Sequence, residues 1–165
     1  MTLNEIGSRA RAVSRDLNSL GSREKNMGLE EAARGLLEGE DEILAANEED
    51  CKRAEENGMS QGLLDRLKLT PARVQSMADG LLKVASLEDP VGEVISMKLR
   101  PNGLKIGQKR VPLGVIGMIY EARPNVTADA FGLCFKTGNA VILKGGSDAM
   151  ESNKAIVRWI RRGLI

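Results

Sequence analysis

The sequence predicts an α/β protein with three consecutive parts: N-terminal helices in residues 1–90, a β-hairpin arm in residues 91–111 and the start of a parallel-sheet domain in residues 112–165. Three observations favour this division. Apolar residues recur every three or four positions through the first part, alternate with polar residues in the second, and form short continuous runs separated by a helical pattern in the third. These patterns are typical of amphipathic helices, a half-exposed hairpin and buried strands.

The N-terminal part contains four helical patterns. Thr2 and Glu5 have the spacing of a capping box, and the apolar stripe that follows them ends at Gly21. Thr70 and Pro71 mark another helix start, a cap followed by proline at the first helical position. After the first helix, the sequence therefore predicts helices over residues 22–37, 41–57 and 71–87.

The hairpin pattern lies in residues 95–106, where apolar and polar residues alternate on both sides of the turn sequence Pro-Asn-Gly at 101–103. A lone hairpin leaves its strand edges without partners. We therefore expect this arm either to lie on another part of its own protein or to pair with another subunit.

The last part follows the order strand, helix, strand, helix. Residues 114–120 and 140–143 are short apolar runs, typical of strands that are buried on both faces of a parallel sheet. A helix is expected over residues 127–136, and Asp148 with Glu151 has the pattern of a cap for a last helix. This order is half of a doubly wound, Rossmann-like unit.

The composition excludes several classes of function. Without histidine, the chain cannot form a Ser-His-Asp or Cys-His catalytic site or an imidazole-based zinc site, and we expect no metal centre. Cys51 and Cys134 have no metal-binding spacing and are expected to be free thiols, which favours a cytoplasmic location. The longest apolar stretch is too short to cross a membrane, and the N-terminus lacks the pattern of a signal peptide.

Charge is distributed unevenly along the chain. Residues 1–70 carry 10 Lys and Arg against 15 Asp and Glu, a balance of −5, whereas residues 71–165 carry 14 against 8, a balance of +6. The second segment is therefore expected to attract anions. Aromatic residues make up only 2% of the chain, too few to stack nucleic-acid bases, so a small phosphorylated ligand fits better than nucleic acid.

Two loops follow the carboxyl ends of the predicted strands, where ligands bind in open parallel sheets. The first loop carries Arg123 and Asn125 beside the start of a helix, a place that favours a phosphate or an oxyanion. The alternative is structural: Asn125 or Thr127 caps the helix, and Arg123 pairs with a surface carboxylate. The residues alone leave both interpretations open.

The second loop consists of Lys144, Gly145, Gly146 and Ser147. It offers a cation, backbone N–H groups and a hydroxyl to a ribose or a phosphate. It matches neither a G-x-G-x-x-G nor a Walker sequence, and a Gly-Gly turn between a strand and a helix can be no more than a turn.

The cysteines are poor candidates for a nucleophile. Cys134 lies in an apolar helical stretch, which is typical of inert, packed cysteines. Cys51, on a heavily charged helix, is no better placed.

Longer stretches around the two loops carry a family resemblance. They are residues 110–129 (RVPLGVIGMIYEARPNVTAD), residues 137–147 (TGNAVILKGGS) and the pair Ser152-Asn153. These stretches resemble the gamma-glutamyl phosphate reductase family, also called glutamate-5-semialdehyde dehydrogenase, within the aldehyde dehydrogenase superfamily. Shorter matches extend the resemblance over nearly the whole chain: LDRL at 64–67, MADG at 77–80, DPVGE at 89–93 and PNGL at 101–104.

The resemblance implies an oxidoreductase of proline biosynthesis. Enzymes of this family use NADPH to reduce L-glutamyl 5-phosphate to L-glutamate 5-semialdehyde with release of phosphate, after a cysteine has attacked the acyl phosphate to form a thioester. It also implies that residues 112–165 begin the Rossmann-like cofactor domain of the aldehyde dehydrogenase fold.

The resemblance assigns roles to single residues of both loops. Asn125 matches the asparagine whose amide contributes to the oxyanion hole, and Lys144 matches the lysine that meets the adenosine ribose. Ser147 stands where NAD-preferring relatives often have a glutamate, which would leave room for the 2′-phosphate of NADP. We also expect Gly145 and Gly146 to bind the cofactor and Arg123 to bind the substrate.

The family's chain is more than twice as long as this one, and its nucleophilic cysteine lies in a later domain. We therefore expect an N-terminal fragment that lacks the catalytic domain and is inactive alone, from an enzyme that is a homo-oligomer when full length. The alternative function is a noncatalytic, truncated module that contributes subunit contacts or cofactor-loop residues to a partner.

Overall fold

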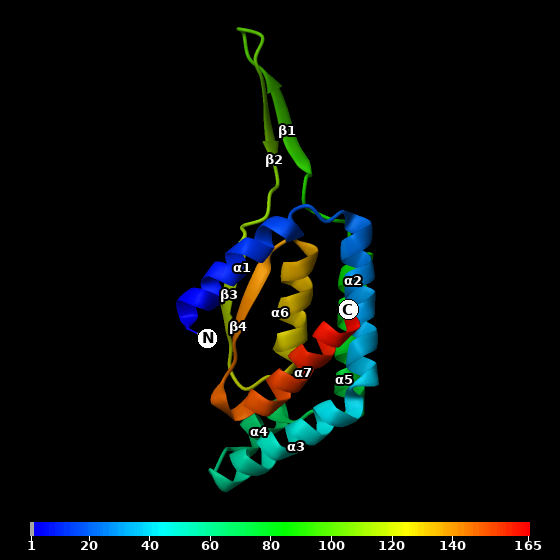
Figure 1. Cartoon of the computed structure of the whole chain (residues 1–165), viewed down its shortest axis with the longest axis vertical. Coiled ribbons are helices and arrows are strands. Elements are labelled where there is room, and N and C mark those ends of the chain that lie inside the picture. Colours follow the sequence, from blue (N-terminus) through cyan, green and yellow to red (C-terminus); the bar gives the residue numbers. More distant parts are fainter. Residues whose placement is uncertain (1) are drawn as a thin grey trace.

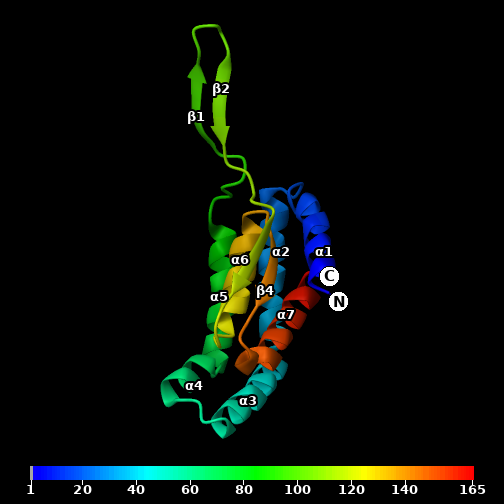
Figure 2. The ribbon, with the colours of Figure 1, turned by 90° about the vertical axis from the view of Figure 1, so that its left-hand side faces the viewer.

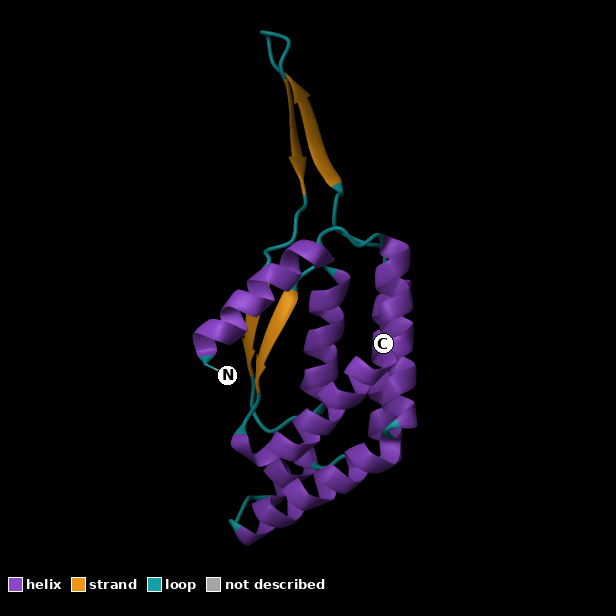
Figure 3. Cartoon of the chain, viewed as in Figure 1, coloured by secondary structure: helices purple, strands orange, loops and turns teal. Residues whose placement is uncertain are grey.

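The computed structural model describes residues 2–165 (Figure 1). Five helices come first, then a hairpin, then alternating strands and helices (Figure 3). The helices of the first segment are α1 (Leu3–Leu17), α2 (Ser22–Glu38), α3 (Glu40–Glu56), α4 (Gln61–Leu67) and α5 (Pro71–Ser86). The other elements are β1 (Val94–Leu99), β2 (Lys105–Lys109), β3 (Val115–Ile119), α6 (Asn125–Lys136), β4 (Ala140–Lys144), the 3-10 turn η1 (Ser147–Ala149) and α7 (Met150–Gly163). The α/β fold class and the predicted element order are confirmed.

The hairpin of β1 and β2 projects from one end of the helical body (Figures 1 and 2). Its strands are antiparallel, with an irregular register between Val94 and Ser96, and its turn contains Gly103 at φ +82°, a conformation that favours glycine. Residues 2–165 leave much of its apolar surface uncovered, because six large side chains are 45–69% exposed: Val94, Ile95, Met97, Leu99, Leu104 and Ile106.

Strands β3 and β4 form a separate, parallel pair, with Val115 opposite Ala140 and Ile119 opposite Lys144. Helices α1 and α6 both pack against β4. The predicted burial on both faces is not found within residues 2–165: every second residue of β3 is exposed, with Ile119 85% exposed, and Ala140 alone is buried in β4. Within residues 2–165, no further strand pairs with the outer edges of this sheet, so part of its apolar surface stays open.

Two helix starts have the predicted local chemistry. Thr2 Oγ1 accepts a hydrogen bond from Glu5 N at 3.3 Å, while Thr2 N donates to the Glu5 carboxylate at 2.7 Å. Thr70 Oγ1 accepts from Arg73 N at 3.2 Å, and Pro71 is the first residue of α5. Helix α4 was not predicted, because its seven residues provide fewer than two turns of apolar periodicity.

Helix α7 is capped by a residue of α3. The predicted cap from Asp148 and Glu151 is wrong, because no side chain of the adjacent sequence caps this helix. Instead, the fully buried Asp50 carboxylate accepts from the backbone N–H groups of Ser152 at 2.8 Å and of Glu151 at 3.3 Å. The Ser152 hydroxyl donates to the same carboxylate at 2.7 Å, and Arg53 pairs with it. The negative charge therefore lies where the helix dipole stabilises it.

Helices from the first and last parts of the chain share one hydrophobic core. Helix α2 packs against α5, α6 and α7, and its residues Leu29 and Leu36 are fully buried. Val74 of α5 and Ile156 of α7 are fully buried in the same cluster. Within residues 2–165, no helix combines the length and hydropathy needed to cross a membrane.

Helices α2 and α7 approach each other closely enough for backbone contact. A Cβ atom on Gly35 would lie 2.5 Å from the Trp159 carbonyl oxygen, and one on Gly163 would lie 2.3 Å from the Glu31 carbonyl oxygen. Any larger residue at either position must push the two helices apart.

Replacing Gly35 by Ala should therefore destabilise the protein. Alanine gains about 0.5–1 kcal/mol of helix propensity over glycine, but overpacking against a backbone atom should leave a net loss of about 1–3 kcal/mol in the free energy of unfolding. Chemical denaturation measures this loss. Gly7→Ala in the middle of α1 is the matched control, since its Cβ would meet nothing within 4 Å and the change should stabilise the protein. Equal effects of the two changes would contradict the close packing.

A buried ionic cluster holds the root of the hairpin. Lys25 Nζ lies 2.5 Å from Asp89 Oδ2, and the two side chains are 2% and 9% exposed. The Ser22 hydroxyl and Val91 N also donate to the Asp89 carboxylate, at 2.9 and 3.0 Å. Burial alone would raise the pKa of Asp89, but these bonds, with that from Lys25 foremost, hold the pKa below its ordinary value.

A second buried lysine joins this cluster from the end of α6. Lys136 Nζ donates to Asn26 Oδ1 at 2.6 Å and to the Ala85 carbonyl at 2.8 Å. Lys25 Nζ also donates to the Lys136 carbonyl at 3.3 Å. Burial lowers the pKa of Lys136, and the nearby Asp89 carboxylate opposes that effect.

Replacing Asp89 by Asn keeps the shape of the side chain but removes its charge. We expect the free energy of unfolding to fall by about 3 kcal/mol near pH 7, because a buried cation loses its partner. The pKa of Asp89 is lower in the folded protein than in the unfolded chain, so its contribution is full above about pH 4 and is lost as the pH falls through the folded value. Urea unfolding at a series of pH values should show a gap between wild type and variant that closes at low pH. A constant gap, or an equal loss in the exposed control Asp16→Asn, would refute this account.

Candidate functional site

The two candidate loops meet at the carboxyl ends of β3 and β4. Tyr120 N donates to the Lys144 carbonyl at 3.1 Å, which continues the pairing of the strands to the start of both loops. A Cβ atom on Gly146 would lie 3.3 Å from the Ala122 backbone nitrogen, so the backbones of the loops pack directly against each other. The parallel pairing thus brings the residues around Asn125 and those around Ser147 to one end of the sheet.

The first loop places Asn125 in an accessible position. Pro124 is buried and adopts a helical conformation, and Asn125 is the exposed first residue of α6. The Asn125 amide donates to Asp129 Oδ2, one helical turn later, at 3.4 Å. Desolvation raises the pKa of Asp129, and this bond from Asn125 opposes the rise. The second amide hydrogen of Asn125 is free to donate to a ligand.

The structure contradicts both alternative interpretations of the first loop, a side-chain cap for α6 and an ion pair of Arg123. No side chain caps α6. Thr127 is fully buried and bonds to Tyr120 and Asn153. Arg123 is exposed and, within residues 2–165, forms no ion pair, so its guanidinium is accessible to an anionic ligand.

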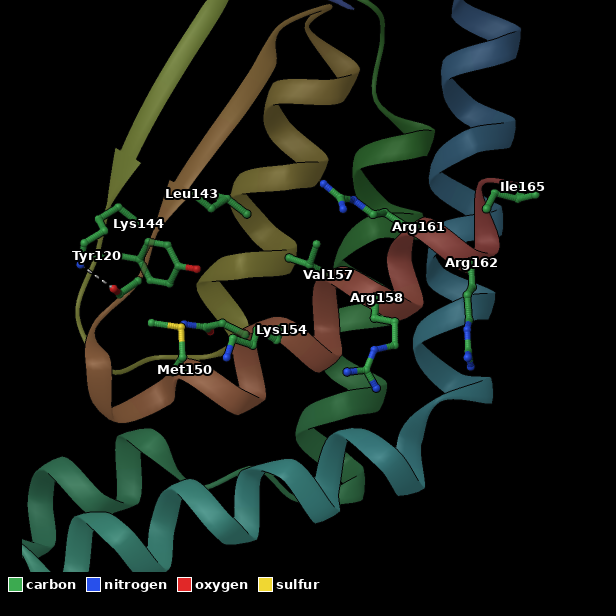
Figure 4. A pocket seen from close by; sticks show the side chains of 12 residues that line it. Tyr120, Leu143, Lys144, Met150, Lys154, Val157, Arg158, Arg161, Arg162 and Ile165 are labelled. Carbon is green, nitrogen blue, oxygen red and sulfur yellow. Dashed lines mark hydrogen bonds between the residues drawn. The ribbon is translucent and has the colours of Figure 1, made fainter. Parts of the chain in front are cut away.

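The second loop presents two polar side chains to solvent and packs its glycines inward. Lys144 is exposed at the end of β4, and its Nζ donates to the Gly145 carbonyl at 3.1 Å (Figure 4). Ser147 is exposed at the first position of η1. A Cβ atom on Gly145 would lie 2.3 Å from the Asn153 amide nitrogen.

A hollow of about 660 Å³ lies between the end of β4 and helix α7 (Figure 4). Its lining contains five basic side chains and no aspartate or glutamate: Lys144, Lys154, Arg158, Arg161 and Arg162. Carboxylates outside the hollow pair with three of them, since Glu151 bonds to Lys154 at 2.8 Å and Glu42 lies 3.4 Å from Arg158 and 3.9 Å from Arg162.

Lys144 and Arg161 have no carboxylate partner within residues 2–165. They give the hollow an excess of positive charge that favours an anionic ligand. Arg161 was not among the site residues predicted from the sequence. The signal was present in the spacing of Arg158, Arg161 and Arg162, which places basic residues three and four positions apart on a helix.

Both cysteines have the environment of unreactive thiols. Cys134 is 4% exposed, and burial raises the pKa of its thiol. Cys51 is half-buried, and burial followed by the charge of Asp50 raises its pKa as well. Because the thiolate is the reactive form, neither environment favours nucleophilic attack.

Sequence comparison shows which proteins this chain is similar to. The gamma-glutamyl phosphate reductase of Halothermothrix orenii is 58% identical over 152 residues, which cover 92% of this chain and 36% of that protein. The enzyme of the same name from Moorella thermoacetica is 59% identical over 156 residues, or 94% of this chain and 37% of that protein. The chain is a relative of the gamma-glutamyl phosphate reductases. It spans less than two fifths of the length of these two relatives, and no protein-family model matches it.

Solved structures of gamma-glutamyl phosphate reductases have the same fold over nearly the whole chain. The Thermotoga maritima structure has a TM-score of 0.95 and 45% identity, and covers 98% of this chain and 39% of its own. The Saccharomyces cerevisiae structure has a TM-score of 0.93 and 31% identity, and covers 99% of this chain and 42% of its own. An NAD-dependent benzaldehyde dehydrogenase from Corynebacterium glutamicum shares the fold at a TM-score of 0.71 and 19% identity, over 94% of this chain and 32% of its own. The aldehyde dehydrogenase fold implied by the sequence resemblance is therefore confirmed.

Proposed function

We propose that this chain is part of an NADPH-dependent gamma-glutamyl phosphate reductase, a glutamate-5-semialdehyde dehydrogenase of proline biosynthesis. The reaction reduces the acyl phosphate of L-glutamyl 5-phosphate to L-glutamate 5-semialdehyde, releases phosphate and oxidises NADPH. The observation that carries the proposal is 58% identity to an enzyme of that name over 92% of the chain. The two adjoining loops and their unpaired cations are consistent with an anionic substrate and cofactor.

The second loop has the donors that suit NADP(H). Lys144 and Ser147 expose an ammonium and a hydroxyl at the end of a strand, and Arg161 adds a cation to the adjoining hollow. Such groups favour ribose hydroxyls and phosphates. In this proposal, Lys144 and Ser147 hold the adenosine end of the cofactor, with Gly145 and Gly146 in the same loop. The bound cofactor supplies the hydride for the reduction.

The first loop suits the reacting end of the substrate. Asn125 exposes an amide donor that can stabilise negative charge developing on the acyl oxygen during nucleophilic attack. Arg123 exposes a cation that can bind a phosphate or carboxylate of L-glutamyl 5-phosphate. We place the nucleophilic cysteine outside residues 1–165, because the environments of Cys51 and Cys134 disfavour a thiolate. On this basis residues 1–165 alone have no reductase activity.

We also propose that residues 91–111 form subunit contacts in a homo-oligomer of the complete enzyme. The hairpin stands away from the helical body (Figures 1 and 2). Six large apolar side chains on it are exposed. Apolar strands of this kind favour a protein partner. The same observation favours the second candidate function, a noncatalytic module that supplies contacts to a partner. The division into residues 1–90, 91–111 and 112–165 and the cytoplasmic location stay predictions.

Asn125→Ala tests the proposed function in the complete enzyme. An oxyanion donor acts mainly in the transition state, so kcat for reduction of L-glutamyl 5-phosphate should fall by about 10²-fold or more while KM changes little. Steady-state kinetics measures both constants, and Asn4→Ala on the exposed surface of α1 is the control. Near-normal kcat in Asn125→Ala would exclude the oxyanion role, and a wild-type enzyme without this reductase activity would refute the function itself.

Ser147→Glu tests the cofactor assignment. A carboxylate beside the 2′-phosphate should lower kcat/KM with NADPH by about 10-fold or more, through repulsion worth roughly 1–3 kcal/mol, and should spare the activity with NADH. Ser8→Glu introduces the same charge on the exposed surface of α1 and should change neither activity. Equal losses with both cofactors would show that Ser147 does not face the 2′-phosphate.

A further inference from the structure

Three polar side chains form a hydrogen-bonded chain beneath the two loops: Thr127 and Asn153, which are buried, and Tyr120, which is half-buried. The Thr127 hydroxyl donates to Asn153 Oδ1 at 2.9 Å and lies 2.7 Å from the Tyr120 hydroxyl. Because a threonine hydroxyl has only one proton, Tyr120 must be the donor to Thr127. The three residues belong to the end of β3, the first turn of α6 and the first turns of α7, so the chain of bonds connects three elements.

The second loop rests directly on this chain of bonds. A Cβ atom on Gly145 would lie 2.3 Å from Asn153 Nδ2 and 3.2 Å from the Tyr120 hydroxyl oxygen. Glycine at this position is therefore required by packing against Asn153 and Tyr120, whatever ligand the loop binds. A displacement of Asn153 must be transmitted to Gly145, and from there to Lys144 and Ser147.

Asn153 itself has little freedom to move. The preceding residue, Ser152, is fully buried; its hydroxyl donates to Asp50 and accepts a hydrogen bond from Asn47 Nδ2 at 3.0 Å. Asn47 Nδ2 also donates to the Leu67 carbonyl at 2.9 Å. Hydrogen bonds with Asn47 and Asp50 of α3 thus hold the start of α7 in place. Thr127 is therefore bonded to a residue, Asn153, that has little freedom to move.

We propose that Thr127 and Asn153 are positioning residues that set the place of Asn125 relative to Lys144 and Ser147. Asn125 lies two residues before Thr127 on the same helical turn, and Lys144 lies next to Gly145. The Thr127–Asn153 bond therefore fixes the oxyanion donor and the cofactor loop in one frame, and the fully buried Thr127 does so without touching substrate or cofactor. This inference rests on the proposed function for its kinetic consequences, although the coupling between the loops does not depend on the reaction.

Thr127→Val in the complete enzyme tests the proposal. The variant keeps the side-chain shape but leaves Tyr120 and Asn153 without their shared partner, and misplacement of reacting groups by about 1 Å can cost about 10²-fold in rate. We expect kcat/KM for NADPH and for L-glutamyl 5-phosphate to fall together by about 10-fold or more. Thr127→Ser, which restores the hydroxyl, should recover most of both.

Thr137→Val is the matched control at the other end of α6. Thr137 donates to the Leu133 carbonyl at 2.7 Å and accepts from Asn139 Nδ2 at 2.9 Å, so its variant also loses local bonds. It should lose stability but keep both kinetic constants. Equal kinetic losses in the Thr127 and Thr137 variants, or normal kinetics in Thr127→Val, would overturn the positioning role.

Hydrogen exchange separates this inference from the proposed function. In Thr127→Val, amides of residues 121–126 and 144–147 should exchange faster together, even if the wild-type enzyme has no reductase activity. Acceleration confined to one of the two loops would overturn the coupling. If Thr127→Val does not fold, Gly145→Ala replaces it: the added Cβ displaces Asn153 from the second loop, and the faster exchange should then reach residues 121–126. An unchanged first loop in Gly145→Ala would refute the proposal.

Discussion

Helix α7 reaches its position because glycines on α2 and directly after it face α7, and because a buried carboxylate meets the N-terminus of α7. Gly35 and Gly39 leave room for the backbone and ring of Trp159, while Asp50 accepts hydrogen bonds from the first turn. A Cβ atom on α2 would move the whole helix, and loss of Asp50 would leave buried N–H groups unpaired. Helix α7 lines the hollow and carries Asn153, against which Gly145 of the second loop packs. The candidate site therefore depends on the position of α7.

The same helix concentrates the positive charge of the C-terminal half. Glu42 of α3 and Glu151 neutralise part of it, because they pair with Arg158, Arg162 and Lys154 at the rim of the hollow. Arg161 and Lys144 are left without a carboxylate partner in residues 2–165, and they lie on opposite sides of the hollow, on α7 and β4. These ion pairs therefore leave the positive charge of the hollow concentrated at Lys144 and Arg161.

Local features could be predicted from the sequence, whereas contacts between distant segments could not. The capping box at Thr2, the start of α5 and the order of strands follow from periodicity and cap chemistry, which depend on neighbours along the chain. The prediction of the α7 cap failed because the residue that accepts hydrogen bonds from the first turn, Asp50, lies about a hundred positions earlier in the sequence. The predicted burial of β3 failed for a similar reason. An apolar run predicts a strand that other elements can cover, but it does not show whether residues 2–165 contain those elements. For the site, the ends of the predicted strands indicated both loops. The packing of Gly145 against Asn153 could not be predicted, because the two residues belong to different elements.

Helix α6 connects the root of the hairpin to the candidate site. Its last residue, Lys136, is held by buried bonds to Asn26 and Ala85, and its first residue is Asn125. Twelve residues that rise about 1.5 Å each make a rod of about 18 Å. Since Thr127 is bound near one end and Lys136 at the other, a shift of α6 at the arm must strain or break buried hydrogen bonds at the site. The arm and Asn125, the proposed oxyanion donor, are thus attached to one rigid element, and the charged cluster around Asp89 supports both.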